Sequence, residues 1–219
     1  MTEKTGKTEK KEKKLEAVSD KRGILYEITR VLAIILFHTI MPVRFHHKER
    51  LLQDPPFVLI ANHRHALDPI AMAMGIPKKQ IIFLGKKELG KTPFLQNIMT
   101  RLHCILVDRH ATDMEAMRAC MKAVKMKKIL LIFPEGTRHH EGEMEHIESG
   151  TALIAMRSKA PVIPIYFDRK LSFFKVTNLY VGEPIPYDDL LAEGINADTC
   201  EQMNERMRET FRKMIRENA

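Results

Sequence analysis

The positions of apolar residues along the chain predict alternating strands and helices. Short continuous apolar runs bounded by Pro, Gly, Asn or charged residues are typical of buried strands. Such runs occupy residues 57–61, 81–84, 104–107, 129–133, 161–167 and 176–182. Helical patterns lie between and after them, at about 70–74, 93–102, 149–159 and 198–216, with a further one that starts at about 113 and runs through 124. This alternation predicts an α/β fold with a mixed, largely parallel sheet covered by helices.

Two of the predicted helices carry a clear apolar stripe. The helix that begins at Thr112 or Asp113 has Met or Val at spacings of three and four, which predicts a buried stripe rather than a binding surface. Its members are Met114, Met117, Met121 and Val124. The C-terminal helix is predicted to face inward with Cys200, Met203, Met207, Phe211 and Met214.

The N-terminal region divides into two segments ahead of the main domain at 45–219. Residues 1–22 are rich in Lys, Glu and Thr and are predicted to form a disordered charged tail without the apolar core of a signal peptide. Residues 23–44 are predicted to form an amphipathic, membrane-associating helix, since Arg30 interrupts a stretch that could otherwise span a bilayer. The alternative is a helix that packs on the core of its own domain.

The charge favours a polyanionic partner. The 219 residues carry a formal net charge of +8, which suits nucleic acid, an anionic lipid surface or a phosphorylated substrate. The chain has no Trp and four Tyr, which argues against a binder of single-stranded nucleic acid that works by base stacking. Cys104, Cys120 and Cys200 form neither a disulfide framework nor a CxxC pair, so reduced intracellular thiols are the simpler account.

The strongest candidate chemistry lies in residues 62–69, directly after the predicted strand at 57–61. Asp68-Pro69 is typical of a helix start, with Asp at the N-cap. The Asp68 carboxylate can accept the ring N–H of His63, which would leave the other ring nitrogen free to take a proton. The alternative is a plain helix cap beside an ordinary loop histidine.

Two further strand ends carry functional groups. In α/β sheets the active crevice forms at the carboxyl ends of the strands. Arg109 and Arg138 follow two such strands and could bind a phosphate through two hydrogen bonds each. Gly136 would let the backbone approach a ligand, and Thr137 adds a hydroxyl.

These segments resemble the motifs of the glycerolipid acyltransferases of the lysophosphatidate (1-acyl-glycerol-3-phosphate) type. Asn62-His63 followed by Asp68 is similar to the first motif of that family, residues 133–138 to the third and residues 162–165 to the fourth. The stretch from Lys86 to Arg109 is similar to the region around the second. The order and spacing agree from about residue 23 to the C-terminal helix.

The resemblance implies a reaction and a set of site residues. His63 would deprotonate the acceptor hydroxyl, Asp68 would orient His63, and the hydroxyl would attack the thioester of acyl-CoA or acyl-carrier protein to give phosphatidic acid. Substrate would be bound by Asn62, Lys86, Arg109, Glu135, Gly136, Thr137 and Arg138, and the acyl pocket would be shaped by Pro164 and Ile165. Neither a metal nor another cofactor is implied. The expected location is the cytoplasmic face of the cell membrane, bound to its anionic surface as a peripheral or monotopic protein, and no nucleic-acid partner is expected.

Three positions depart from the family pattern. His103 replaces a common glycine, Glu148 lies where lysine is frequent, and His65 stands where a small hydroxyl residue is common. The departures leave the His63/Asp68 pair intact. They leave the acceptor open between lysophosphatidate and another lysophospholipid or hydroxylated lipid.

Two other classes of function stay open from the residues alone. His63-x-His65 with Asp68 could belong to a metal-dependent hydrolase, although Arg64 sits between the two histidines and the spacing of the acid differs. A non-catalytic basic module that binds membrane or nucleic acid is the second alternative. A metal site does not account for residues 135–138. The basic residues that the second alternative would need are spread over the tail, loops and helices rather than gathered on one recognition helix.

Overall fold

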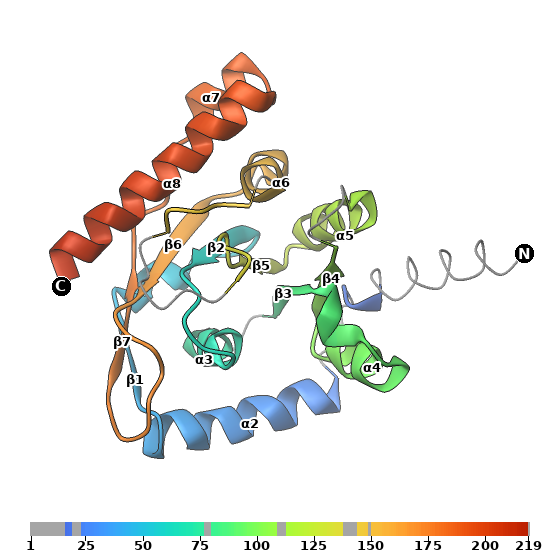
Figure 1. Ribbon diagram of the computed structural model, residues 1–219, viewed down its shortest axis with the longest axis vertical. Coiled ribbons are helices and arrows are strands. Elements are labelled where there is room, and N and C mark those ends of the chain that lie inside the picture. The colour runs from blue at the N-terminus through green and yellow to red at the C-terminus, as the bar shows by residue number, and fades with distance from the viewer. Residues whose placement is uncertain are drawn as a thin grey trace, which may run out of the picture.

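A seven-stranded sheet forms the centre of the protein (Figure 1). The computed structural model describes residues 16–18, 23–76, 80–108, 113–137, 144–148 and 150–218. In spatial order the strands are β1 (Val43–His46), β7 (Thr177–Val181), β6 (Val162–Phe167), β2 (Phe57–Ala61), β5 (Ile129–Ile132), β3 (Ile81–Lys86) and β4 (Cys104–Val107). The β6–β7 pair is antiparallel and every other neighbouring pair is parallel. The predicted mixed, largely parallel sheet is therefore confirmed.

Helices cover both faces of this sheet. The helices of the described residues are α2 (Ile24–Thr39), α3 (Asp68–Gly75), α4 (Pro93–Arg101), α5 (Met114–Lys125), α6 (Gly150–Ser158), α7 (Asp188–Glu193) and α8 (Ala197–Asn218), with short 3-10 turns η1 (Lys48–Leu51) and η2 (Lys87–Gly90). Helices α5, α6 and α8 lie over one face, and α2 and α3 over the other (Figure 1). Two buried faces explain why the strands are continuous apolar runs.

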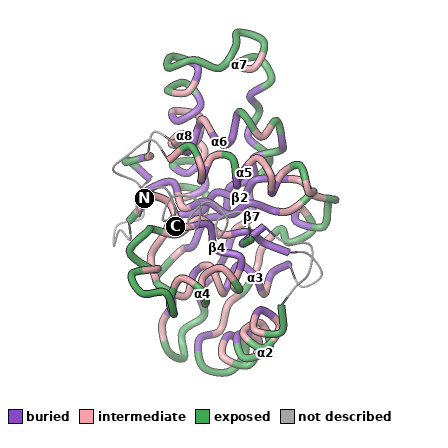
Figure 2. The backbone as a smooth tube through the Cα atoms, turned by 90° about the vertical axis from the view of Figure 1, so that its right-hand side faces the viewer, coloured by how far each residue is buried: buried purple, intermediate pink, exposed green. Residues whose placement is uncertain are grey.

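Alternate strand residues divide between two apolar cores. In β2, Val58 and Ile60 belong to the core under α5, α6 and α8, whereas Phe57, Leu59 and Ala61 belong to the core under α2 and α3. Successive side chains of a strand point to opposite faces of the sheet, and in β2 both faces are buried. Figure 2 shows the buried residues concentrated along the strands and the inner sides of the helices.

Helix α5 buries a face that overlaps only in part with the predicted one. The residues that meet the sheet are Ala116, Ala119, Cys120 and Ala123. Of the predicted stripe, Met117, Met121 and Val124 are half-buried and pack against the edge of this core, whereas Met114 is 47% exposed, so the stripe is confirmed only in part. Small side chains let the helix approach the sheet closely, which leaves the methionines at the side of the helix.

The structure adds elements that the pattern did not predict. The basic segment around Arg44 and His46 contains the edge strand β1, whose Val43 and Phe45 pack on the core under α2 and α3. Helix α7 was also missed. Ala17 and Val18 fall in the segment predicted as a tail, yet both are buried, so the part of the chain that packs on the domain begins before residue 23. The rest of the predicted tail lies outside the described residues.

Helix α2 has two apolar faces. Tyr26, Ala33 and Phe37 are buried on its inner face, as the alternative of a core-packed helix requires. Its outer face exposes Ile24, Ile28, Val31, Leu32 and Ile35. Among the helices in the described part of the chain, none is long and apolar enough to cross a membrane.

The two faces of α2 should respond differently to truncation. Phe37→Ala removes a ring that is 1% exposed and should lower the free energy of unfolding by about 3–5 kcal/mol. Ile35→Ala, at a side chain that is 56% exposed, should change it by less than about 0.5 kcal/mol. Urea unfolding of both variants, followed by circular dichroism, checks this. Equal losses would contradict the assignment of the inner face.

Candidate active site

Four strand ends meet at one edge of the sheet. Strands β2, β5, β3 and β4 are neighbours and run parallel, so the loops that follow them lie side by side. A cavity of about 930 Å³ lies at this edge and is lined by His63, Lys86, Asp108, Gly136 and Thr137, among others. The loops that carry the predicted functional residues therefore do come together at this edge, as far as these residues show.

His63 and Asp68 form a directly bonded pair at the mouth of β2. The His63 ring Nδ1 lies 2.9 Å from Asp68 Oδ2. The Asp68 side chain is fully buried, while that of His63 is 18% exposed. The same oxygen, Oδ2, accepts the backbone N–H groups of Arg64 and His65, each at 2.7 Å. Because Oδ2 already accepts two bonds, it acts as an acceptor toward the ring too, so Nδ1 carries a proton, and in the neutral ring the lone pair is on Nε2.

The start of α3 differs by one residue from the prediction. Leu67 occupies the N-cap position and Asp68 is the first residue of the helix. The Asp68 carboxylate turns back to the preceding loop instead of capping the helix. This difference is what allows it to hold His63.

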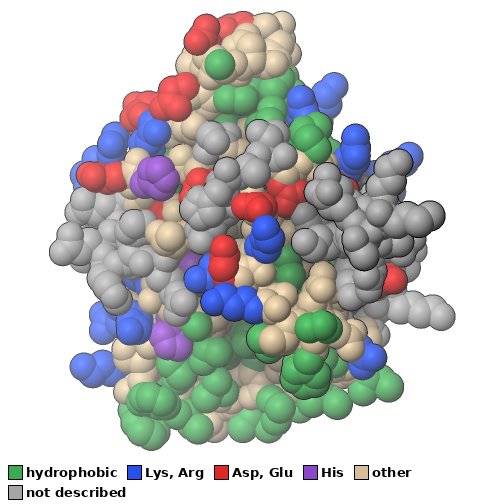
Figure 3. Space-filling model, turned by 45° about the vertical axis from the view of Figure 1, so that its right-hand side comes forward, with side chains coloured by type: hydrophobic (Ala, Val, Ile, Leu, Met, Phe, Trp, Pro, Cys, Tyr) green, Lys and Arg blue, Asp and Glu red, His purple; other side chains and the backbone are tan. Residues whose placement is uncertain are grey.

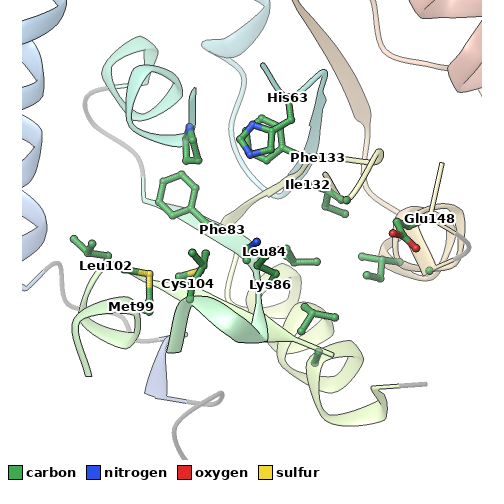
Figure 4. A pocket seen from close by; sticks show the side chains of 18 of the residues that line it. His63, Phe83, Leu84, Lys86, Met99, Leu102, Cys104, Ile132, Phe133 and Glu148 are labelled. Carbon is green, nitrogen blue, oxygen red and sulfur yellow. The ribbon is translucent and has the colours of Figure 1, made fainter. Parts of the chain in front are cut away.

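The loop after β5 fixes His63 from the other side. Glu135 is 2% exposed, and its Oε2 accepts the backbone N–H of His63 at 2.9 Å. The Phe133 ring lies against the imidazole, with centroids 4.2 Å apart and planes inclined by 30° (Figure 4). Among the described residues no protein group is bonded to His63 Nε2. Ring and backbone of His63 are therefore both held, and its free nitrogen is available to a ligand.

Asn62 has a positioning role rather than the predicted substrate-binding role. It is fully buried, and its Nδ2 donates to the carbonyl of Phe167 at 3.1 Å. Its Oδ1 accepts the N–H of Phe167 at 2.8 Å. Both ends of the amide are thus used to tie the end of β2 to the end of β6.

The other predicted binding residues fall into three groups. Lys86, Gly136 and Thr137 line the cavity, and Gly136 adopts φ 64°, a turn conformation that suits glycine. Pro164 and Ile165 do not line it, because both are buried within β6 on the far side of β2, so the predicted role in the acyl pocket is not supported by their position. Arg109 and Arg138 lie outside the described residues.

Most of the cavity wall is apolar and comes from residues that the sequence analysis did not assign to it (Figure 4). Representative members are Ile70, Phe83, Met99, Cys104, Met114 and Met117. Burial raises the pKa of the Cys104 thiol to about 12, so the thiol stays neutral and serves as an apolar part of the wall. The methionine repeat on α5 is the feature of the sequence that indicates this wall, although its spacing predicts a buried core stripe.

Charged groups at the cavity edge stabilise the start of the loop that leads to residue 109. Lys87 Nζ lies 2.8 Å from Asp108 Oδ2, and this hydrogen bond raises the pKa of Lys87. Asp113 accepts the N–H of Asp108 at 3.0 Å and that of Ala116 at 2.9 Å, which caps α5 as predicted. The two flanks of 109–112 are thereby fixed to each other.

In the part of the chain that the structure describes, the side chains of the alternative metal site are used by other contacts. His63 Nδ1 is bonded to Asp68, and His65 Nδ1 accepts the N–H of Leu67 at 3.2 Å. Within the described ranges, no three His, Cys, Asp or Glu side chains come together in a way that could hold a metal ion.

A protein-family model described as Acyltransferase matches residues 42–168, which include the His63–Asp68 pair and most of the cavity loops. The chain belongs to the acyltransferase family. A 1-acyl-sn-glycerol-3-phosphate acyltransferase of Bacillus subtilis is 30% identical over 78% of this acyltransferase and 89% of the relative. One of the same name from Streptococcus pneumoniae is 25% identical, over 89% of this chain and 74% of the relative.

The fold of this acyltransferase also has a counterpart among solved structures. The crystal structure of PlsC from Thermotoga maritima, a 1-acyl-sn-glycerophosphate acyltransferase, superposes with a TM-score of 0.63 at 21% identity. The match covers 88% of this chain and 77% of that one. This likeness supports the architecture described above.

Removing the negative charge of the hydrogen-bond acceptor in the pair should reduce turnover without unfolding the acyltransferase. Asp68→Asn replaces one carboxylate oxygen by an N–H donor and weakens control of the ring tautomer, so kcat should fall roughly 10²- to 10⁴-fold. Steady-state kinetics measure this, and Asp189→Asn, at an exposed ion pair with Arg206 on α8, is the matched control. A kcat within threefold of the wild type would remove Asp68 from the mechanism.

Proposed function

We propose that this acyltransferase moves a fatty acyl group from acyl-CoA or acyl-carrier protein to the free hydroxyl of 1-acyl-glycerol-3-phosphate, giving phosphatidic acid. The observation that carries the proposal is the His63–Asp68 pair, bonded at 2.9 Å, beside a largely apolar cavity. A base next to a space for an aliphatic chain suits acyl transfer between a thioester and an alcohol. The names of the relatives support the choice of acceptor.

The chemistry follows from the free nitrogen of His63. Nε2 takes the proton of the acceptor hydroxyl as its oxygen attacks the thioester carbonyl carbon. The tetrahedral intermediate collapses with loss of the thiolate, which takes the proton back from the imidazolium and leaves as the thiol. Asp68 favours the imidazolium while it exists. Positioning and general base catalysis are sufficient for a reactive thioester, so we propose no metal or other cofactor.

The two parts of the cavity suggest where each substrate binds. Lys86 and Thr137 lie at the rim, and we assign them, with Arg109 and Arg138, to the phosphate and glycerol of the acceptor. The acyl chain would occupy the apolar part between α3, β3, α4 and α5. We also propose that the membrane supplies the lipid substrates. The apolar outer face of α2 would rest on the anionic cytoplasmic surface of the cell membrane. We propose no role for nucleic acid.

The central test measures thiol release from a long-chain acyl-CoA with lysophosphatidate added or withheld. Release should require both the acceptor and His63, with His63→Ala roughly 10²- to 10⁴-fold slower because the base is lost. His146→Ala, at an exposed histidine, is the matched control. Release without acceptor would indicate a thioesterase, and absence of release with every acyl-CoA and carrier-protein donor would overturn the proposal.

A second acceptor class is favoured by one residue. Glu148 lines the cavity, and its backbone N–H is bonded to the Pro134 carbonyl at 2.8 Å, so it is fixed beside the loop of Gly136 and Thr137. A carboxylate at this position repels a phosphate dianion and attracts an ammonium group, so it favours a lysophospholipid whose headgroup carries one.

A panel of lysophospholipids separates the two acceptors. If Glu148 selects a cationic headgroup, lysophosphatidylethanolamine will be the better acceptor, and Glu148→Lys will shift kcat/KM toward lysophosphatidate by about tenfold, as one charge contact of about 1.4 kcal/mol requires. Glu145→Lys, at an exposed acid, makes the same charge change away from the cavity. Preference for lysophosphatidate in the wild type, unchanged by Glu148→Lys, would dismiss the second class.

A further inference from the structure

The loop between β6 and β7 exposes two adjacent aromatic side chains. Phe173 is 67% exposed and Phe174 is 80% exposed, although Leu171, two residues earlier, is buried in the core under α2 and α3. Lys170 and Lys175 flank the pair, and both are exposed. Apolar rings bordered by lysines suit insertion at the headgroup boundary of an anionic membrane.

The loop is held against the C-terminal end of α2. The backbone N–H of Phe174 donates to the carbonyl of Ile40 at 2.7 Å, and that of Thr177 donates to Pro42 at 2.9 Å. Ser172 and Lys175 form an isolated antiparallel bridge that closes the loop. Figure 1 shows the loop reaching the level of α2, beside its end. The two phenylalanines therefore keep a fixed position relative to this helix.

The backbone at Phe174 is unfavourable for its residue type. It adopts φ 56°, in the left-handed region where Gly or Asn would be at ease. An aromatic residue in this conformation, with most of its ring in water, gains little from the protein itself. A ligand outside the protein that buries the ring would account for both features.

The loop lies at the same end of the domain as the outer face of α2 (Figure 1). That face exposes Ile28, Val31, Leu32 and Ile35, each more than half. Figure 3 shows hydrophobic side chains gathered over the lower end of the molecule, where α2 lies in Figure 1. Helix and loop thus present apolar groups on the same side of the domain.

We propose that Phe173 and Phe174 insert into the interface of an anionic bilayer and form, with the outer face of α2, a two-part membrane contact. This deepens the membrane association in the proposed function and rests on it. Charge complementarity favours lipid over a second copy of the chain. A symmetric contact between two copies would bring the lysines of both loops, Lys170 and Lys175, into one interface in a protein of net charge +8.

The test is co-sedimentation of the full chain with large unilamellar vesicles of phosphatidylcholine and phosphatidylglycerol in a 3:1 ratio. Phe173→Ser/Phe174→Asn removes both rings and places at 174 a residue that tolerates the left-handed backbone. We expect its partition coefficient to fall about 10- to 100-fold, as loss of one or two buried aromatic rings implies. Leu52→Ser is the matched control, because Leu52 is 71% exposed after η1, at the other end of β1, and it should change the partition less than twofold.

Two further arms separate this inference from the acyltransferase reaction and from self-association. His63→Ala should bind the vesicles as the wild type does, so failure of the reaction would leave the docking result readable. Lys170→Gln/Lys175→Gln should weaken binding to the anionic vesicles and leave binding to pure phosphatidylcholine unchanged. Unaltered partition of the double phenylalanine variant, with an unchanged unfolding temperature, would overturn the proposal. A wild-type dimer in the absence of lipid that becomes a monomer in this variant would also overturn it.

Discussion

One buried carboxylate oxygen, Oδ2 of Asp68, sets the geometry on which the site depends. It accepts the ring N–H of His63 and the backbone N–H groups of Arg64 and His65 within 2.9 Å. A carboxylate that is fully removed from water needs such donors, since leaving it without them would be strongly unfavourable. The loop therefore has to fold around Asp68, and the same folding turns His63 into position and fixes its tautomer before any substrate binds.

The sheet topology holds this loop from both sides. Strand β2 lies between β6 and β5, and hydrogen bonds connect both neighbouring segments to the residues that follow β2. On the β6 side, the Asn62 amide is bonded to both backbone groups of Phe167. On the β5 side, Glu135 holds the N–H of His63. Asn62 and Glu135, which the family resemblance assigns to substrate binding, thus hold His63 in position. Because they connect His63 to three adjacent parallel strands, the imidazole is held as rigidly as the sheet.

The strands, and the functional residues that follow them, could be predicted from the sequence because a buried strand is a continuous apolar run with clear ends. Strand β2 has the predicted bounds, and the His63–Asp68 bond is the first of the two arrangements that the spacing allows. The faces of α5 could not be predicted in this way, since periodicity identifies residues that share a face without saying which face meets the sheet. The alternation of Val43 and Phe45 in β1 spans only four residues and was hidden by its basic neighbours.

Some departures from the family pattern also have local physical reasons that only the backbone reveals. His103 stands where glycine is common, and it has φ 61°, the left-handed conformation that glycine adopts without strain. Its ring is buried, with Nδ1 bonded to the carbonyl of Ala17 at 2.9 Å and an edge contact to Tyr26. The substitution therefore ties the chain ahead of α2 to the start of β4, a contact between distant segments that no local pattern encodes.

Helix α2 joins these two levels of organisation. Tyr26 and Thr29 line the cavity on its inner side, while Ile28 and Ile35 are exposed on its outer side. A helix that is apolar nearly all round is usually buried on every side. Here the inner face is covered by the domain, and the outer face would be covered by the bilayer proposed above, so each apolar face has its own partner. The cavity beside His63 and the lipid surface would then be separated by the thickness of one helix, and a substrate from the membrane would have a short path to His63.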